Sequence, residues 1–264
     1  MMDKQRKLIP VLGTLFLLGL MLLGCGEGQE EASDRDAFVE ALRLKLANPS
    51  RSEEDKARDA GRKPAQVIGF LGITEGMTVI DLVASSGYYT EVLSNAVGPT
   101  GTVYAQNPAP NLQSRGSAND KVLTARLANN RLANVVRWDR ELEDIWASDH
   151  DLEPDSVDAA ITALNFHDMD PKSAADMLSI MRFVLKPGGV LGIIDHAGNL
   201  GENNDQLHRV EEQTVIDAVQ TAGFVIEATS DLLRIANDDR SKRVFDPGMR
   251  GKTDRFLLKL RNPN

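Results

Sequence analysis

Two of the four histidines follow predicted strands and have an aspartate beside them. His167 precedes Asp168 after a strand predicted over residues 156–166, and His196 follows Asp195 at the end of another predicted strand. A histidine, with an ordinary pKa of about 6.5, can take a proton from a hydroxyl, an amine or an acid while a neighbouring aspartate orients its ring. We therefore predict His167, Asp168 and His196 as catalytic residues that move a proton.

Two other interpretations of these histidines stay open. Each ring could cap a strand end and bond a backbone carbonyl. Alternatively, the nitrogens and oxygens of this region could ligate a divalent metal ion, with His167, Asp168, Asp195, His196 and His208 as the candidates. Their spacing does not match an H-E-x-x-H motif, and we predict no metal site from it.

The stretch from Met77 to Asn107 predicts the elements that would position such a site. It reads as a buried strand (78–83), a turn of small residues (84–87), a helix (88–97) and a second strand (102–106). This is the first half of a βαβ unit, and ligands bind at its turn. The helix directs unpaired backbone N–H groups there, which favours a polar or negatively charged ligand group.

The rest of the chain continues the alternation of strands and helices. Helices are predicted over 33–47, 52–63, 64–72, 120–130, 173–185 and 211–222, strands over 134–138, 156–166, 190–195, 224–228 and 255–260, and a loop over 107–119. This order predicts a mainly parallel sheet that is covered on both faces.

Five segments in this order resemble the class I S-adenosylmethionine-dependent methyltransferases. They read VIDLVASSGYYTEVLS, GTVYAQN, NVVRWDR, SVDAAITALNFHD and LKPGGVLGIIDH, and the resemblance spans about residues 64–260. It implies an α/β fold: a doubly wound, Rossmann-like, seven-stranded, mainly parallel sheet with an antiparallel C-terminal hairpin. The NxHD, DH, LHR, SDLLR and DPxxRGKTDR segments are similar to a branch of predicted secreted methyltransferases.

The resemblance implies S-adenosyl-L-methionine as the cofactor. The implied cofactor-binding residues are Asp81, Ser85, Gly87, Tyr88, Asn107, Asp139 and Asn165. The family's D-x-G-x-G-x-G motif keeps only its last glycine here, because Val83 and Ser85 replace the first two. A branched side chain narrows the crevice and resists a positive φ. Asn107 replaces the acid that holds the ribose hydroxyls, so it offers a neutral hydrogen bond only.

A basic excursion, residues 230–255, is the predicted substrate-binding segment, because clustered arginines suit carboxylate or phosphate groups. The predicted substrate contacts are Arg62, His208, Arg234, Arg250 and Lys252. The alternative is a solvated segment with internal Asp–Arg pairs. Residues 52–63 form either a solvated helix or a lid that turns Arg62 toward the ligand.

The N-terminus predicts export and lipid anchoring. Residues 1–24 have the basic start and apolar run of a signal peptide, and the ending LLGC resembles the lipobox of bacterial lipoproteins. This implies lipidation of Cys25 and a membrane anchor, with the periplasmic face of the outer membrane as the expected location. An uncleaved N-terminal anchor is the alternative. We divide the chain into a signal peptide (1–24), a lipidated cysteine and spacer (25–35), a helical extension (36–72) and a methyltransferase-like domain (73–264).

Composition limits the remaining choices. The formal net charge of −9 gives no support to non-specific nucleic-acid binding, and a single cysteine excludes an intrachain disulfide. We therefore predict a lipid-anchored methyltransferase that acts on a small molecule or an envelope component. The alternatives are a ligand-binding lipoprotein that retains the fold without its usual cofactor, and a metal-dependent enzyme.

Overall fold

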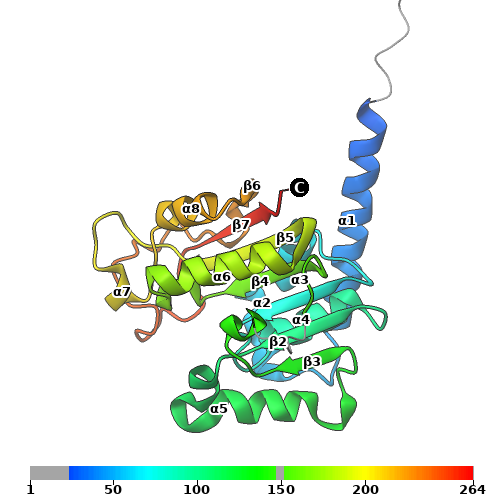
Figure 1. The fold of residues 1–264 in the computed structure, drawn as a ribbon, viewed down its shortest axis with the longest axis horizontal. Helices are drawn as coiled ribbons and strands as arrows, with labels where there is room; N and C mark the ends of the chain where they lie inside the picture. Colours follow the sequence, from blue (N-terminus) through cyan, green and yellow to red (C-terminus); the bar gives the residue numbers. More distant parts are fainter. Residues whose placement is uncertain (1–23, 147–151, 264) are drawn as a thin grey trace, which may run out of the picture.

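The computed structural model describes residues 24–146 and 152–263, which form a seven-stranded sheet between helices (Figure 1). The strand order is β3-β2-β1-β4-β5-β7-β6. The first five strands in this order are parallel, and β7 is antiparallel to both β5 and β6. The predicted parallel sheet with an antiparallel C-terminal hairpin is confirmed. The strands are β1 (Thr78–Leu82), β2 (Thr102–Gln106), β3 (Val135–Trp138), β4 (Val157–Ala163), β5 (Leu185–His196), β6 (Val225–Ser230) and β7 (Arg255–Arg261).

Helices cover both faces of the sheet, and each face has its own apolar core. On one face α6 (Pro171–Val184) and α8 (Glu212–Thr221) pack on apolar side chains of β1, β5 and β7. On the other face α3 (Pro64–Leu71) and α4 (Tyr88–Val97) pack on β1, β2 and β4. Because the central strands are buried on both sides, they read as nearly continuous apolar runs. The remaining helices are α1 (Gly24–Leu46), α2 (Glu53–Arg62), α5 (Ala109–Leu127), α7 (Asn204–Leu207) and the short 3-10 helices η1 (Ala128–Asn130), η2 (Leu142–Trp146), η3 (Phe166–Asp168) and η4 (Asp231–Leu233).

The N-terminal helices share the core of the main domain. Leu42 and Leu46 of α1 are buried beside α3 and α4. Gly69 of α3 allows α1 to approach α3 closely, since a Cβ at this position would lie 2.4 Å from Val39 Cγ2 of α1. The predicted helical extension is therefore an integral part of the sheet's cover.

The start of α1 differs from the prediction. The helix was expected from Ser33, but it begins at Gly24 and includes the residues assigned to a spacer. Its N-terminal part extends away from the body of the protein (Figure 1). Of the predicted signal peptide, only Gly24 belongs to the described residues. Within these residues, no helix has the length and apolar character needed to cross a membrane.

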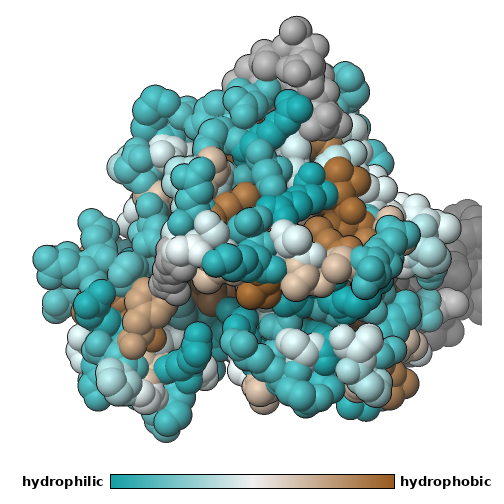
Figure 2. Space-filling view, turned by 90° about the horizontal axis from the view of Figure 1, so that it is seen from below, coloured by the Kyte–Doolittle hydropathy of each residue, from teal (hydrophilic) through white to brown (hydrophobic). Residues whose placement is uncertain are grey.

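The predicted loop over residues 107–119 is also wrong, because α5 begins at Ala109. Pro110 lies in the first turn of this helix, where its missing N–H would have no intrahelical partner and its fixed φ suits the helix. Pro110 is thus part of a helix start. The face in Figure 2 is mostly hydrophilic, with smaller hydrophobic patches, in keeping with the acidic composition.

Candidate functional site

The turn after β1 follows a left-handed path at three alternate residues. The φ angles are 50° at Val83, 54° at Ser85 and 80° at Gly87. The turn therefore keeps the backbone that glycine favours although two glycines are replaced. Side chains at the end of β2 hold it: Val83 N–H donates to Gln106 Oε1 (3.0 Å), and Ser85 N–H donates to Asn107 Oδ1 (2.7 Å).

Polar residues follow the carboxyl ends of the neighbouring strands. Asn107, after β2, is completely buried, and its Nδ2 has no hydrogen-bond partner within the described chain. Asp139, after β3, is partly exposed and pairs with Arg137 Nε at 2.6 Å. Asn165, after β4, donates from Nδ2 to the carbonyl of Ala163 (3.0 Å). The predicted cofactor residues thus lie along one edge of the sheet, and the free group at Asn107 is a donor.

Asp81 at the end of β1 is a buried carboxyl group. Thr90 Oγ1 donates to its Oδ2 at 2.6 Å. Burial raises the pKa of Asp81 to about 7, against the opposing effects of the Thr90 hydrogen bonds and the charges of Arg62 and Arg126. Near neutral pH this group is therefore only partly ionised.

Helix α2 contacts the start of α4, just after the β1 turn, and its role as a lid stays a prediction. Tyr88 donates its hydroxyl to Asp59 Oδ1 (2.6 Å), and the guanidinium of Arg62 lies 4.4 Å from the centroid of the Tyr88 ring. Arg51 also pairs with Asp59. Tyr88 therefore contacts α2, and Arg62 is held near Asp81 by its ring contact.

His167 is oriented by Asp195. His167 Nδ1 lies 2.7 Å from Asp195 Oδ1, and the backbone N–H of His167 donates to Asp195 Oδ2 (2.9 Å). Burial works against protonation of the ring, but the hydrogen bond and charge of Asp195 and the charge of Asp168 raise the pKa of His167 above its ordinary value. His167 can therefore accept and hold a proton. Asp168 lies at the other end of the ring, 3.4 Å from Nε2.

His196 has the opposite electrostatic environment. Burial, with the nearby charges of His167, Arg255, Arg209 and Arg62, lowers the pKa of His196 to about 2. Its Nδ1 is buried without a hydrogen-bond partner in the described chain. A ring with so low a pKa is a weak base near pH 7, so the opposite directions of the two pKa shifts favour His167 over His196 for proton transfer.

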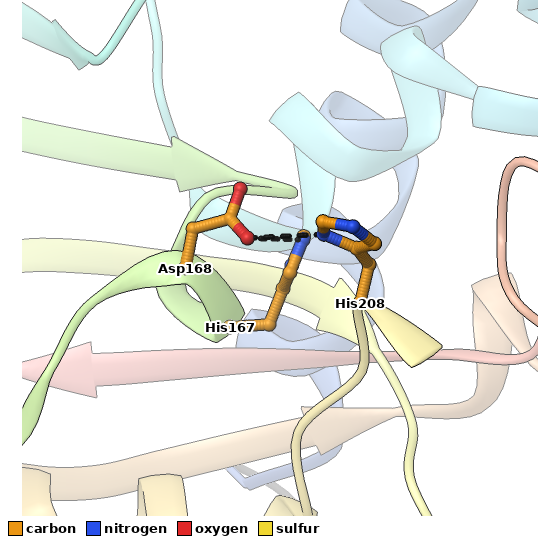
Figure 3. Close-up of side chains that lie close together, drawn as sticks. All are labelled: His167, Asp168 and His208. Atoms are coloured by element: carbon orange, nitrogen blue, oxygen red, sulfur yellow. Dashed lines mark hydrogen bonds and ion pairs between the residues drawn. The ribbon is translucent and has the colours of Figure 1, made fainter. Parts of the chain in front are cut away.

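His208 completes a cluster with the η3 residues. His208 Nδ1 lies 3.1 Å from Asp168 Oδ1, and the side chains of His167, Asp168 and His208 point toward one another (Figure 3). His167 and Asp168 also line a cavity of about 740 Å³ between η3, α7 and α8. The structure thus brings His208 to the catalytic candidates, although 40 residues separate it from Asp168.

The other predicted substrate contacts are not all free. Arg234 pairs with Glu212 and with Asp254, so the internal ion pairs expected as the alternative are present. Lys252 lines a separate hollow beside Met249. Arg250 is exposed in the same segment. Their substrate roles stay predictions.

Sequence reasoning missed two buried arginines that hold α2 in place. Arg255 of β7 donates from Nη2 to the carbonyl of Gly61 (2.7 Å), and burial lowers its pKa. Arg126 of α5 donates from Nε to the carbonyl of Ser86 (3.0 Å) and from Nη2 to Asp55 (2.6 Å). The acidic residues of α2 were the sequence signal for such partners. A helix with almost no apolar face can pack on the domain only through polar or charged side chains.

Comparison with known proteins finds similarity in structure. No protein-family model matches the chain, and no curated protein matches it. The structure of an S-adenosylmethionine-dependent methyltransferase from Aquifex aeolicus superposes with a TM-score of 0.57 and 22% identity, over 84% of this chain and 97% of that one. The chain has the S-adenosylmethionine-dependent methyltransferase fold.

Two further structures support the methyltransferase fold. A putative sarcosine dimethylglycine methyltransferase from Galdieria sulphuraria has a TM-score of 0.56 at 16% identity, over 77% of this chain and 85% of that one. Geranyl diphosphate C-methyltransferase from Streptomyces coelicolor A3(2) has a TM-score of 0.56 at 16% identity, over 82% and 83%. At such identities the likeness establishes the fold alone.

Proposed function

We propose that this protein is a lipid-anchored methyltransferase that uses S-adenosyl-L-methionine and acts on a small molecule or an envelope component. The fold supports the reaction class, and the edge of the sheet supplies groups that suit the cofactor. The observation that supports the proposal is the His167–Asp195 pair, in which Nδ1 of the ring lies 2.7 Å from Asp195 Oδ1 just after the carboxyl end of β4.

The residues present fit a nucleoside cofactor in part. Asn107 Nδ2 is a buried donor that makes no hydrogen bond within residues 24–146 and 152–263, and a ribose hydroxyl oxygen can accept from it. Asp139 supplies a carboxylate at the end of β3, the strand adjacent to β2, which Asn107 follows. When bound, S-adenosyl-L-methionine supplies an electrophilic methyl group on a sulfonium ion.

The chain's own residues then have two tasks. His167 takes the proton of the attacking hydroxyl, amine or acid, and Asp195 keeps its ring in place. Helix α2, as a lid, would bring Arg62 toward the ligand from its position against the Tyr88 ring. Alignment of the nucleophile with the methyl group provides most of the rate enhancement in such a reaction.

One observation favours a second candidate, a ligand-binding lipoprotein with the same fold. The N–H groups of Val83 and Ser85 are already bonded to Gln106 and Asn107. They are therefore not free for a bound ligand in this conformation, and a weaker or different ligand would suit the crevice.

Equilibrium binding of S-adenosyl-L-methionine to the purified full chain, by titration calorimetry in detergent, separates the two candidates. We expect Asp139→Asn to weaken binding by about tenfold, the effect of losing one hydrogen bond to a charged group. Asp120→Asn is the matched control, because Asp120 also pairs with Arg137 but lies on α5. Absence of binding to the folded wild-type chain at millimolar cofactor would exclude the methyltransferase proposal.

A further inference from the structure

At the centre of the cluster of His167, Asp168 and His208 lies a ring nitrogen that makes no hydrogen bond within the described residues. The side chain of His167 is only 3% exposed, and its Nε2 is buried without a hydrogen-bond partner in the described chain. The other ring nitrogen, Nδ1, is hydrogen-bonded to Asp195, whose Oδ1 lies 2.7 Å away. If Nδ1 donates its proton to Asp195, Nε2 presents a lone pair to the carboxylate of Asp168. Two electron-rich groups face each other there, and a cation between them would stabilise the arrangement.

The distances within the cluster suit one coordination sphere. Two ligands that are each about 2.0–2.2 Å from a metal ion, at tetrahedral or octahedral angles, lie about 2.8–3.6 Å apart. Asp168 Oδ1 lies 3.4 Å from His167 Nε2 and 3.1 Å from His208 Nδ1. One donor atom from each residue can be chosen so that all three lie within 4.8 Å of one another. Small side-chain rotations would bring the two rings onto a common ion.

We propose that His167, Asp168 and His208 bind one divalent first-row transition-metal ion, through His167 Nε2, a carboxylate oxygen of Asp168 and a ring nitrogen of His208. A metal-bound Nε2 cannot take a proton, so in the metal-bound protein the ion would replace His167 as the group that activates the nucleophile. Two imidazoles and one carboxylate favour Zn²⁺ or a similar ion over Mg²⁺ and Ca²⁺, which prefer oxygen ligands. Asp195 holds the proton on His167 Nδ1, the usual arrangement behind a metal-binding histidine.

The surroundings favour a cation and leave room for a further ligand. The cavity of about 740 Å³ beside His167 and Asp168 is lined by four more acids, Asp170, Glu202, Asp205 and Glu211. The cation in its wall is Arg209, whose charge is balanced by Asp238. The field in this cavity therefore attracts positive ions. Three protein ligands also leave open positions on the metal, as in catalytic sites.

Metal binding to the purified full chain tests the site without reference to methyl transfer. After chelator treatment, Zn²⁺ and Co²⁺ are titrated in competition with a chromophoric chelator. We expect one ion per chain, and a visible Co²⁺ spectrum that changes in His208→Gln. Asp168→Asn and His208→Gln should each weaken binding at least about tenfold. Both side chains reach solvent, with exposures of 64% and 28%, so the variants should fold.

Matched variants separate this site from general attraction to the acidic surface. Asp170→Asn removes a charge from the same cavity, and its amide oxygen can still accept from the N–H groups of Lys172 and Ser173. His150→Gln removes a histidine elsewhere in the sequence. Both should bind as the wild type does. Lack of saturable one-to-one binding, wild-type affinity in Asp168→Asn or His208→Gln, an equal loss in Asp170→Asn, or displacement by a modest excess of Mg²⁺ would each overturn the proposal.

Discussion

Val83 holds a backbone conformation that a branched residue rarely adopts. Its φ of 50° places it in the left-handed region, at a cost of about 1–2 kcal/mol for an L-residue. Glycine would remove that strain. Glycine also has more conformational freedom in the unfolded chain, and losing this freedom on folding costs about 0.4–1 kcal/mol more than for valine. We therefore expect Val83→Gly to raise the free energy of unfolding by about 1 kcal/mol, measured by urea denaturation.

The same exchange at Val122 is the control. Val122 lies on α5 and is 46% exposed, so Val122→Gly should cost a few tenths of a kcal/mol through helix propensity. Under the methyltransferase proposal, Val83→Gly should also tighten cofactor binding, because the crevice widens. Equal destabilisation in both variants would show that Val83 is not strained.

Asp81 gives a second prediction, on pH dependence. Its pKa is about 7 in the folded protein and has an ordinary value of 3.8, so the folded state holds the proton more tightly. The corresponding stability is fully present below about pH 4 and is lost as the pH rises through about 7. Asn in its place cannot ionise and can still accept from Thr90. Asp81→Asn should therefore gain stability relative to the wild type between about pH 4 and 8, by up to about 4 kcal/mol.

Urea denaturation of both proteins across this pH range measures the two free energies of unfolding. The other titrating groups contribute equally to both proteins, so their effects cancel when one free energy is subtracted from the other. A difference between the two proteins that does not change with pH would contradict the raised pKa of Asp81.

The residue types of the site were visible in the sequence, but their pairing was not. The DH segment offered Asp195 as an orienting acid, and the structure selects it over Asp168 for His167. The environments of His167 and His196 could not be predicted, because burial and the arginines near His196 depend on tertiary contacts. His208 reaches Asp168 through the path of the loop after β5, which no local pattern specifies.

Among the elements, α2 depends on a buried charge network. Arg126 contacts Asp55 of α2, Glu91 of α4 and the carbonyl of Ser86. The side chains of these three charged residues are at most 6% exposed. Arg126→Met would remove a positive charge that pairs with the buried carboxylates of Asp55 and Glu91. We therefore expect the free energy of unfolding to fall by about 3–5 kcal/mol.

Arg43→Met is the control variant, because both side chains of the Arg43–Glu40 ion pair on α1 are more than half exposed. It should change stability by no more than about 1 kcal/mol. Denaturation of both variants measures the difference. A similar small effect in both would show that α2 does not rely on Arg126.

Local signals predicted most elements and failed where two signals competed. The helices predicted over 52–63 and 64–72 are confirmed: Ser52 caps α2 and Pro64 begins α3, and such signals act within one turn. In residues 107–119, proline, asparagine and glycine favoured a loop, while the position of Pro110 in a first turn favoured the helix that forms. The polar residues after Cys25 lack an apolar face, so periodicity gave no sign that α1 continues through them.

At the scale of the molecule, the alternation of strands and helices predicted a mainly parallel sheet, and the resemblance implied seven strands with a final antiparallel hairpin. Parallel strands joined by helices, followed by a final hairpin, fit the observed order β3-β2-β1-β4-β5-β7-β6. The position of the domain relative to a membrane is a separate matter. Residues 1–24 carry Asp3 against Lys4, Arg6 and Lys7, so the chain from Cys25 onward has a net charge of −11. Anionic lipid would repel such a domain.

Electrostatic attraction therefore does not supply the proposed anchor, which acts through lipid on Cys25. The part of α1 that precedes its contact with Gly69, residues 25–34, would serve as a spacer of about 15 Å. We expect the wild-type chain from bacterial membranes to begin at Cys25, to incorporate a labelled fatty acid and to stay in the membrane fraction after a high-salt wash. Hydrophobic anchoring is insensitive to salt, whereas electrostatic adsorption is not. Cys25→Ser should lack both the label and cleavage before residue 25, which mass spectrometry of the N-terminal peptide detects. A Cys25→Ser chain that is cleaved and retained like the wild type would show that the membrane attachment does not use this cysteine.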